Sequence, residues 1–332
     1  MDARGCEAMD KTQFITSLQQ NYESMSLFFN ADMSSAIKVP LAVHYSFSRE
    51  TFQGIQFEAQ MKSLQRKAVK QTLVEYFSTV STKSVLSYKV AAHLILHEQP
   101  EQEIQRVAQN ERFLEAAGFA SSTYQSIAAL FLIDEAHAKR AKLLYREMKK
   151  QHQFLTDKDD IPYAVLLTRE QADTELLGQT MRCYYDALVQ QGFKRGDALQ
   201  AMTQLLTLYD VYFEPLLLDY VVAIRSHLKR ENIKMRRNFY PFIAMLALAR
   251  SDETVLSDIV KMNNELKQLS MFTLEPSLAL MTATQFVLQQ LIDNNQLQQF
   301  NNSLLFLQAL TMSDFLYDAG FTIAFDIFDL FI

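Results

Sequence analysis

The chain has 332 residues, of which 49% are hydrophobic and 21% charged, and its formal net charge is −6. This balance excludes a disordered chain, which combines few apolar residues with a high net charge. The chain has 7 glycines and 6 prolines. These are too few for the many tight turns of a strand-rich fold, so we expect an all-α protein.

The first 56 residues predict an N-terminal helical cap, with a pair of helices near residues 11–47. The opening residues, Met1 to Lys11, are polar and include acids, which is not the pattern of a signal peptide. The two cysteines, Cys6 and Cys183, are too few for a disulfide scaffold. We therefore expect a cytoplasmic protein.

Residues 57–302 show internal self-similarity, which predicts three repeats at about 57–133, 134–210 and 211–292. In each repeat a short apolar helix is followed by a longer amphipathic helix, which ends at Gly118-Phe119, Gly192-Phe193 or Met271-Phe272. The two glycines stand where a helix needs a left-handed residue after its last turn. One four-helix unit buries too little surface alone. We therefore expect the units and the N-terminal pair to stack into one elongated or curved, solenoid-like array.

The segment 303–332 is unusually apolar for a chain end. Four carboxylates interrupt it, at Asp314, Asp318, Asp326 and Asp329. Each would cost several kcal/mol in the core of a bilayer, so we expect no membrane span. We interpret the segment as an apolar helix that caps the last repeat. The alternative is that it docks on a partner or on a second copy of the chain, as a homodimer.

The most distinctive residues lie between about 113 and 206. They include Ala117-Gly118-Phe119, the run from Tyr145 to His152, the Asp159-Asp160 pair and the Gly192-Phe193-Lys194 turn. In these motifs the chain resembles an uncharacterised bacterial family, known as a domain of unknown function. The resemblance implies an all-helical, cytoplasmic protein and no particular activity. It marks His152 and the Asp159-Asp160 pair as the family positions to watch.

Basic residues concentrate in the segments 60–71, 137–152 and 225–237, which hold 16 of the 32 basic residues and 2 of the 38 acidic ones. Each segment precedes the short apolar helix of a repeat, so stacking would align them into a basic stripe for a macromolecular partner. Such a stripe could hold nucleic acid, an acidic protein segment or anionic lipid, and we favour an acidic protein segment over nucleic acid. The alternative is that these cations contact neighbouring helices or helix C-termini. The binding candidates are Lys139, Arg140, Lys142, Arg146, Arg225, Lys229 and Arg230.

Two histidine patterns are candidates for metal or acid–base chemistry. His93 and His97 are four residues apart, which places both imidazoles on one face of a helix, as a metal pair requires. The pattern includes no third ligand, and two ordinary half-buried histidines are the alternative. His152 precedes the Asp159-Asp160 pair, and a nearby carboxylate can orient a histidine for proton transfer. The alternative there is a helix end followed by a capping loop.

No motif specific to one reaction is present, so we favour a non-enzymatic helical-repeat binding or scaffold protein that uses the basic stripe. The alternative is a hydrolase or metal-dependent enzyme with a site near His152, Asp159 and Asp160. We expect no cofactor, since the chain lacks the glycine-rich loops that bind nucleotides and dinucleotides.

Overall fold

The computed structural model of the protein describes residues 9–29, 33–67, 85–151, 155–297 and 302–317. Within these ranges the chain forms fifteen α-helices and three short 3₁₀-helices, and it contains no β-strand. The predicted all-α class is confirmed. Among the described helices, none is both long and apolar enough to cross a membrane.

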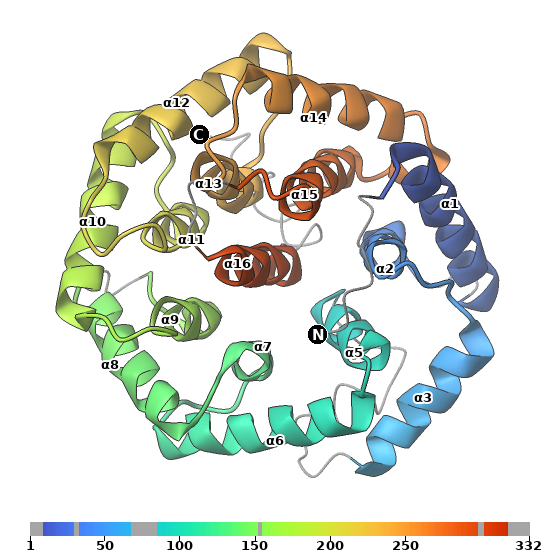
Figure 1. The fold of residues 1–332 in the computed structure, drawn as a ribbon, viewed down its shortest axis with the longest axis horizontal. Coiled ribbons are helices and arrows are strands. Elements are labelled where there is room, and N and C mark those ends of the chain that lie inside the picture. Colours follow the sequence, from blue (N-terminus) through green and yellow to red (C-terminus); the bar gives the residue numbers. More distant parts are fainter. Residues whose placement is uncertain (1–8, 30–32, 68–84, 152–154, 298–301, 318–332) are drawn as a thin grey trace, which may run out of the picture.

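The helices alternate between an outer and an inner ring (Figure 1). The outer ring consists of α1 (Lys11–Phe28), α3 (Gly54–Lys67), α6 (Pro100–Ala116), α8 (Glu135–Gln151), α10 (Thr174–Gln190), α12 (Pro215–Arg230) and α14 (Glu253–Leu266). The inner ring consists of α2 (Ser35–Phe47), α5 (Val85–Leu96), α7 (Thr123–Phe131), α9 (Ile161–Leu167), α11 (Asp197–Leu206), α13 (Tyr240–Leu248) and α15 (Pro276–Asp293). The inner helices are seen nearly end-on in Figure 1, whereas the outer helices run around the circumference, head to tail.

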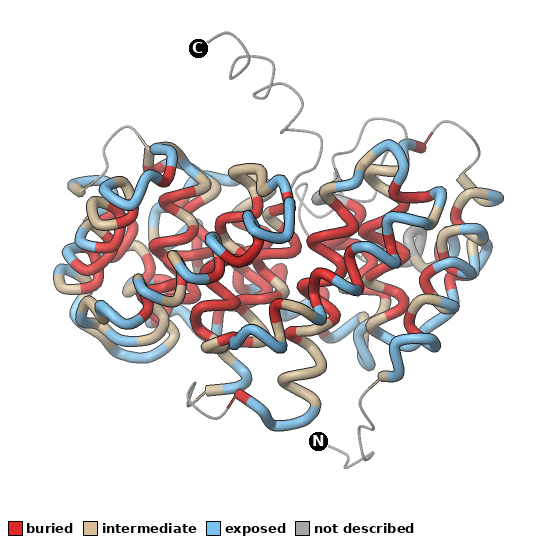
Figure 2. The backbone as a smooth tube through the Cα atoms, turned by 90° about the horizontal axis from the view of Figure 1, so that it is seen from above, coloured by how far each residue is buried: buried red, intermediate tan, exposed pale blue. Residues whose placement is uncertain are grey.

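The place of a helix in the two rings follows from its pattern of apolar residues. Outer helix α8 buries one stripe, which includes Ala138, Ala141, Leu144 and Met148, and exposes its charged positions. Inner helix α9 is buried at every position, and α13 at eight of nine. A helix that is apolar on all sides is stable only inside the protein. Figure 2 accordingly shows the buried positions gathered within the body of the ring.

The ring closes between α1 and the last outer–inner pair. The ammonium of Lys11 lies 2.7 Å from the carboxylate of Glu265 in α14. Behind this ion pair, the rings of Phe14 in α1 and Phe286 in α15 have centroids 4.9 Å apart. The described helices thus form a closed ring, whereas the sequence predicted an elongated or curved array and gave no indication of closure. The apolar pattern determines which helices are inside, but it does not determine the angle between successive pairs.

Two of the predicted helix ends are confirmed. Gly118 and Gly192 have φ angles of 91° and 80°, in the left-handed region. In both turns the amide of the following phenylalanine donates to the carbonyl five residues earlier, at 3.0 and 3.1 Å. The third predicted end, at Met271-Phe272, is wrong. Helix α14 ends at Leu266, and Ser270–Phe272 form the 3₁₀-helix η3.

Helix α16 (Ser303–Leu316) lies in the centre of the ring (Figure 1), where it contacts α5, α7, α9, α13 and α15. Lys89 of α5 is completely buried and fixes the end of this helix. Its ammonium donates to the main-chain carbonyls of Asp314 and Tyr317 and to the Asp314 carboxylate. A buried ammonium needs such partners because its desolvation is costly. The described part of the segment 303–332 is therefore an internal helix, and residues 318–332 lie outside the described residues.

Candidate functional site

The N-terminal ends of the inner helices α9, α11 and α13 lie together on one face of the ring. Gln200, in the first turn of α11, donates to the carboxylate of Asp160, which directly precedes α9, at 2.9 Å. The amide of Lys194 donates to the hydroxyl of Tyr240, the first residue of α13, at 3.3 Å. The connections that lead into these helices follow α8, α10 and α12. The ends of two predicted basic segments therefore lie on the same face.

The predicted binding residues of α8 do not share one environment. Lys139 is exposed and lies 2.6 Å from the carboxylate of Glu135. Arg140 reaches the main-chain carbonyl of Thr168, just after α9, at 3.4 Å. Arg146 is exposed, and its guanidinium makes no ion pair within the described part of the chain. The cations of the segment 60–71 have no described side chains. The predicted stripe across all three basic segments therefore stays a prediction.

Two other predicted binding residues, Lys142 and Arg225, cap the outer helix that precedes their own. Lys142 donates to the carbonyl of Gly118 at 2.6 Å, and its ammonium lies 4.4 Å from the ring centre of the phenylalanine after that glycine. Arg225 donates to the carbonyl of Gln191 at 2.5 Å and lies 4.2 Å from the corresponding phenylalanine ring. Partial burial lowers the pKa of Lys142. For these two residues the structure shows the contact with helix C-termini that was the sequence-based alternative.

Eight exposed cations lie where α8, α10 and α12 end and in the connections that follow α10 and α12. We call this group the basic edge; its members are Arg146, Lys149, Lys150, Lys194, Arg195, Lys229, Arg230 and Lys234. Lys150 pairs with Glu147 at 2.6 Å and Arg230 with Glu253 at 3.3 Å. Such exposed pairs contribute little stability, about 0–1 kcal/mol each. Three of the predicted binding residues, Arg146, Lys229 and Arg230, belong to the basic edge.

Two members of the basic edge, Lys194 and Arg195, were not predicted from the sequence as binding residues. Two neighbouring cations do not stand out as a charge run, so counting basic residues does not find them. Their position does carry a signal, because they follow the confirmed helix end at Gly192 directly. The connection after α10, which contains both residues, lies beside the ends of the neighbouring outer helices α8 and α12.

Asp160, one of the predicted catalytic candidates, is buried and bound to fixed partners at the start of α9. Its carboxylate accepts hydrogen bonds from the side-chain amides of Gln200 at 2.9 Å and Gln204 at 2.5 Å, and from the main-chain amide of Asp157 at 2.9 Å. Burial raises the pKa of Asp160 to about 8, and the negative charge of Asp159 adds to this effect, whereas the three hydrogen bonds oppose it. The carboxylate therefore favours its neutral form at neutral pH.

The neighbouring Asp159 is mostly buried, and burial, followed by the negative charge of Asp197, raises its pKa to about 6. His152, the third member of the predicted acid–base site, lies outside the described residues. The capping loop that was the alternative prediction is present, since Asp157 and Asp160 form a capping box around the 3₁₀-helix η1 (Lys158–Asp160). A catalytic role for these residues stays a prediction that the described residues do not test.

The predicted histidine pair consists of one half-buried residue, His93, and one exposed residue, His97. The His93 ring lies 5.8 Å from that of His44 and 5.5 Å from that of Phe315 in the central helix. Burial, and then the proximity of His44, lowers the pKa of His93 to about 3. His97 follows the end of α5, is exposed, and accepts a hydrogen bond from the amide of Gln99 at 3.2 Å. In the described ranges no group of three or more histidine, cysteine or acidic residues is placed to hold a metal ion.

The fold and these sites define an all-helical ring protein with a helix at its centre and a basic edge on one face. The chain belongs to the family described as "Protein of unknown function (DUF4003)", whose model matches residues 21–313. The predicted resemblance to an uncharacterised family is thus confirmed. The chain is also similar to the uncharacterized protein YeaA of Bacillus subtilis (strain 168), with 26% identity over 156 residues. That match covers 47% of this chain and 46% of the relative, so it spans about half of the relative's length. No solved structure matches the chain.

Proposed function

We propose that this protein is a non-enzymatic binding protein that holds an acidic protein segment along the basic edge. The observation that carries the proposal is the placement of eight exposed cations at the ends of α8 and α12 and in the connections that follow α10 and α12. Arg146, Arg195 and Lys229 make no ion pair to another described residue, so their charge is available to a ligand. Cations gathered on one surface steer an anionic partner and select it against cationic ones.

The charge of the rest of the molecule favours a short protein segment over nucleic acid. The chain carries a net charge of −6. Asp159 and Asp197 stand next to the starts of the inner helices α9 and α11, inward of the basic edge. A polyanion that spread across this face would meet these carboxylates, which it would repel. A short acidic segment that follows the circumference stays away from these two carboxylates. The acids it meets at the basic edge include Glu147 and Glu253, which are already paired with cations of that edge.

We further infer that the outer–inner pairs are structural repeats and that the units 57–133, 134–210 and 211–292 each hold two such pairs. The matching caps at Gly118 and Gly192 support this inference, as do the similar contacts of Lys142 and Arg225. Since each pair buries its apolar face against its neighbours, we regard the ring, the N-terminal cap 1–56 and the segment 303–332 as one unit.

The remaining expectations about location and assembly also stay proposals. We place the protein in the cytoplasm. A homodimer through the segment 303–332 would have to form through residues 318–332, because α16 packs inside the ring. The hydrolase or metal-enzyme alternative near His152, Asp159 and Asp160 is not part of the proposal, because the Asp160 carboxylate is already bound by three fixed donors.

The proposal is tested by fluorescence anisotropy with a labelled glutamate-rich peptide and a single-stranded DNA of equal charge. The edge variant carries three charge reversals, Lys149→Glu, Arg195→Glu and Lys229→Glu. The control variant reverses three exposed cations on α6 and at α14, Arg112→Glu, Lys261→Glu and Lys267→Glu, so that both variants have the same net charge.

We expect the wild type and the control to bind the peptide at low salt, and the edge variant to lose this binding. High salt should weaken peptide binding by the wild type and by the control variant, because salt ions screen exposed charges. Equal binding of the peptide by the edge variant would contradict the proposal. If the DNA bound more tightly than the peptide, the partner of the basic edge would be a nucleic acid and not an acidic protein segment.

A further inference from the structure

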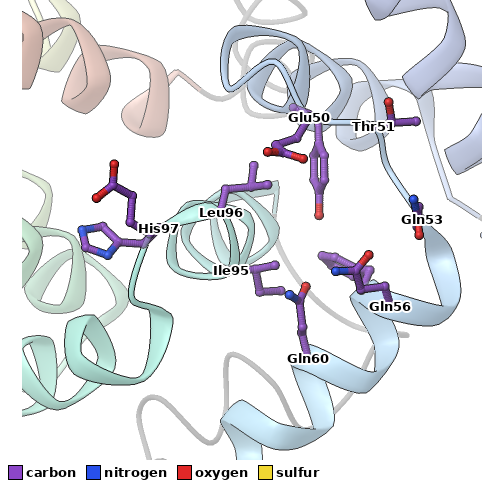
Figure 3. Close-up of a pocket in the computed structure, with 11 residues that line it drawn as sticks. Glu50, Thr51, Gln53, Gln56, Gln60, Ile95, Leu96 and His97 are labelled. Atoms are coloured by element: carbon purple, nitrogen blue, oxygen red, sulfur yellow. The ribbon is translucent and has the colours of Figure 1, made fainter. Parts of the chain in front are cut away.

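A pocket of about 300 Å³ opens between α2, α3 and α5 (Figure 3), in a part of the ring away from α8, α10 and α12 (Figure 1). Its volume is at the lower end of the range of small-molecule sites, about 300–1,000 Å³. The lining includes Tyr45 and Phe57, each 4% exposed, and Ile95, which is 5% exposed. The pocket therefore has an apolar and aromatic floor of a size that suits a small ligand.

The aromatic part of this floor is held in place by its neighbours. Phe52 lies between the two aromatic lining residues, with ring centroids 5.3 Å from Tyr45 and 5.3 Å from Phe57. Phe29 packs against the same group, 5.6 Å from Phe52 and 5.9 Å from Phe57. Because these ring–ring contacts already fix the Tyr45 and Phe57 side chains, a ligand would not have to restrict their motion, and the entropic cost of binding is lower. An aromatic ring face attracts a cation.

One wall of the pocket carries three side-chain amides. Gln56 and Gln60 are four residues apart, which places them on the same side of α3, and Gln53 directly precedes this helix. Figure 3 shows Gln56 and Gln60 on the side of α3 that faces Ile95 of α5. None of the three amides donates a hydrogen bond to another described residue. They are therefore available to a ligand with polar groups, as donors and as acceptors.

The opening of the pocket is acidic. Glu50, in the connection between α2 and α3, and Glu98, in the connection between α5 and α6, both line it and are both exposed. Neither carboxylate makes an ion pair within the described part of the chain, and no lysine or arginine is among the lining residues. His97 also lines the pocket, and its ring lies 3.9 Å from the carboxylate of Glu103. Carboxylates beside a low-dielectric floor create a negative potential that favours a cationic ligand.

We propose that this pocket binds a small organic amine. The ammonium group would lie against the Tyr45 and Phe57 rings and donate a hydrogen bond to the carboxylate of Glu50 or Glu98. The glutamine side-chain amides would bind further polar groups of the ligand. An anionic ligand would be repelled by the two carboxylates, and a neutral polyol would leave them without a charge partner. The site is separate from the basic edge, so the two proposals are tested independently.

The experiment is isothermal titration calorimetry of the full chain with 1,4-diaminobutane, spermidine and agmatine as the amines. The neutral 1,4-butanediol and the dianion succinate have similar size and serve as the comparison ligands. The variants Glu50→Gln and Glu98→Gln keep the shape of each side chain and remove its charge. Asp219→Asn, which removes one exposed carboxylate from the outer helix α12, is the control of equal charge change.

We expect at least one amine to bind at millimolar or lower concentration in moderate salt, and the diol and the diacid not to bind. At least one of the two glutamate substitutions should weaken the amine about tenfold, the effect of losing one charge-assisted hydrogen bond, and unchanged affinity in both variants would contradict the proposal. Asp219→Asn should leave the affinity unchanged, and thermal unfolding of all variants should match the wild type. The proposal fails if no amine binds, if the diol binds as tightly as the diamine, or if the control weakens binding as much as the glutamate variants.

Discussion

Replacing Asp160 by alanine and by asparagine separates its structural contribution from its charge. Alanine removes the acceptor of three hydrogen bonds, from Gln200, Gln204 and the main-chain amide of Asp157. At about 1 kcal/mol for each lost bond, we expect the free energy of unfolding to fall by about 3 kcal/mol. Asparagine keeps one acceptor for the Asp157 amide. Its amino group can meet the side-chain oxygens of Gln200 and Gln204, which have no partner in the structure, if these amides rotate. We therefore expect it to cost less than about 1 kcal/mol at neutral pH.

The pH dependence of stability gives the stronger test. In the unfolded chain an aspartate has a pKa of about 3.9, and burial raises the folded-state pKa of Asp160 to about 8. Between these values the folded protein holds more protons than the unfolded one. The free energy of unfolding therefore falls as the pH rises, by up to about 1.4 kcal/mol per pH unit for one group. The stabilisation by the neutral carboxyl is complete below the unfolded-state pKa and is lost as the pH rises through the folded-state pKa.

The assay is urea unfolding followed by circular dichroism, at about pH 5.5 and about pH 8, for the wild type and both variants. The stability of the wild type relative to Asp160→Asn should be higher at the lower pH, because only the wild type carries the Asp160 carboxyl. The lowered pKa of His93 acts in the opposite direction on both proteins, so it does not affect this comparison. Asp159, whose pKa is raised to about 6, remains in both proteins and leaves a residual slope. An equal pH dependence in the wild type and the asparagine variant would refute the reasoning. So would an alanine variant as stable as the wild type.

Three further substitutions test the helix ends and the centre of the ring. Gly192→Ala meets no atom within 4 Å of its new Cβ, so its cost, about 1–2 kcal/mol in chemical denaturation, should come from the left-handed backbone alone. Lys89→Met should destabilise by about 3–5 kcal/mol, because it leaves Asp314 buried without its cation; a smaller loss of Tm than that of Gly192→Ala would contradict this. Arg225→Ala removes a hydrogen bond and a contact with the Phe193 ring. It should lower the free energy of unfolding by about 1 kcal/mol, whereas Lys229→Ala, at an exposed position of the same helix, should have no measurable effect.

The local features of the fold were predictable because their causes lie within a few residues. Scarce glycine and proline indicated helices, and Gly118 and Gly192 marked two helix ends correctly. The prediction failed at Met271-Phe272, where there is no left-handed residue to end a helix. Asn232, with a φ of 57°, ends α12 in the way that the two glycines end their helices. Asparagine tolerates this conformation but is common elsewhere in helical proteins, so it gives a weaker signal than glycine.

Features that depend on distant parts of the chain were not predictable. The closure of the ring depends on the angle between successive pairs, which side-chain packing determines and apolar periodicity does not. Lys89 is a charged residue within an apolar helix, and only the arrival of Asp314, more than two hundred positions later, explains it. The basic segments were recognisable as charge runs. That Lys142 and Arg225 contact the preceding helix end, whereas Arg146 and Lys229 remain exposed, depends on how adjacent outer helices meet.

The closed ring has a consequence for how the chain is made. The contacts of Lys11 with Glu265 and of Phe14 with Phe286 join the start of the protein to its last outer–inner pair. During synthesis, about 250 further residues must therefore be translated before α1 and α2 can contact the last outer–inner pair. Translation proceeds at roughly 5–20 residues per second. The central helix α16 emerges later still. Throughout this interval the apolar surfaces of the inner helices are not fully packed against neighbouring helices, so the incomplete chain is prone to aggregate. We expect a chaperone to be needed mainly before residue 303 has left the ribosome.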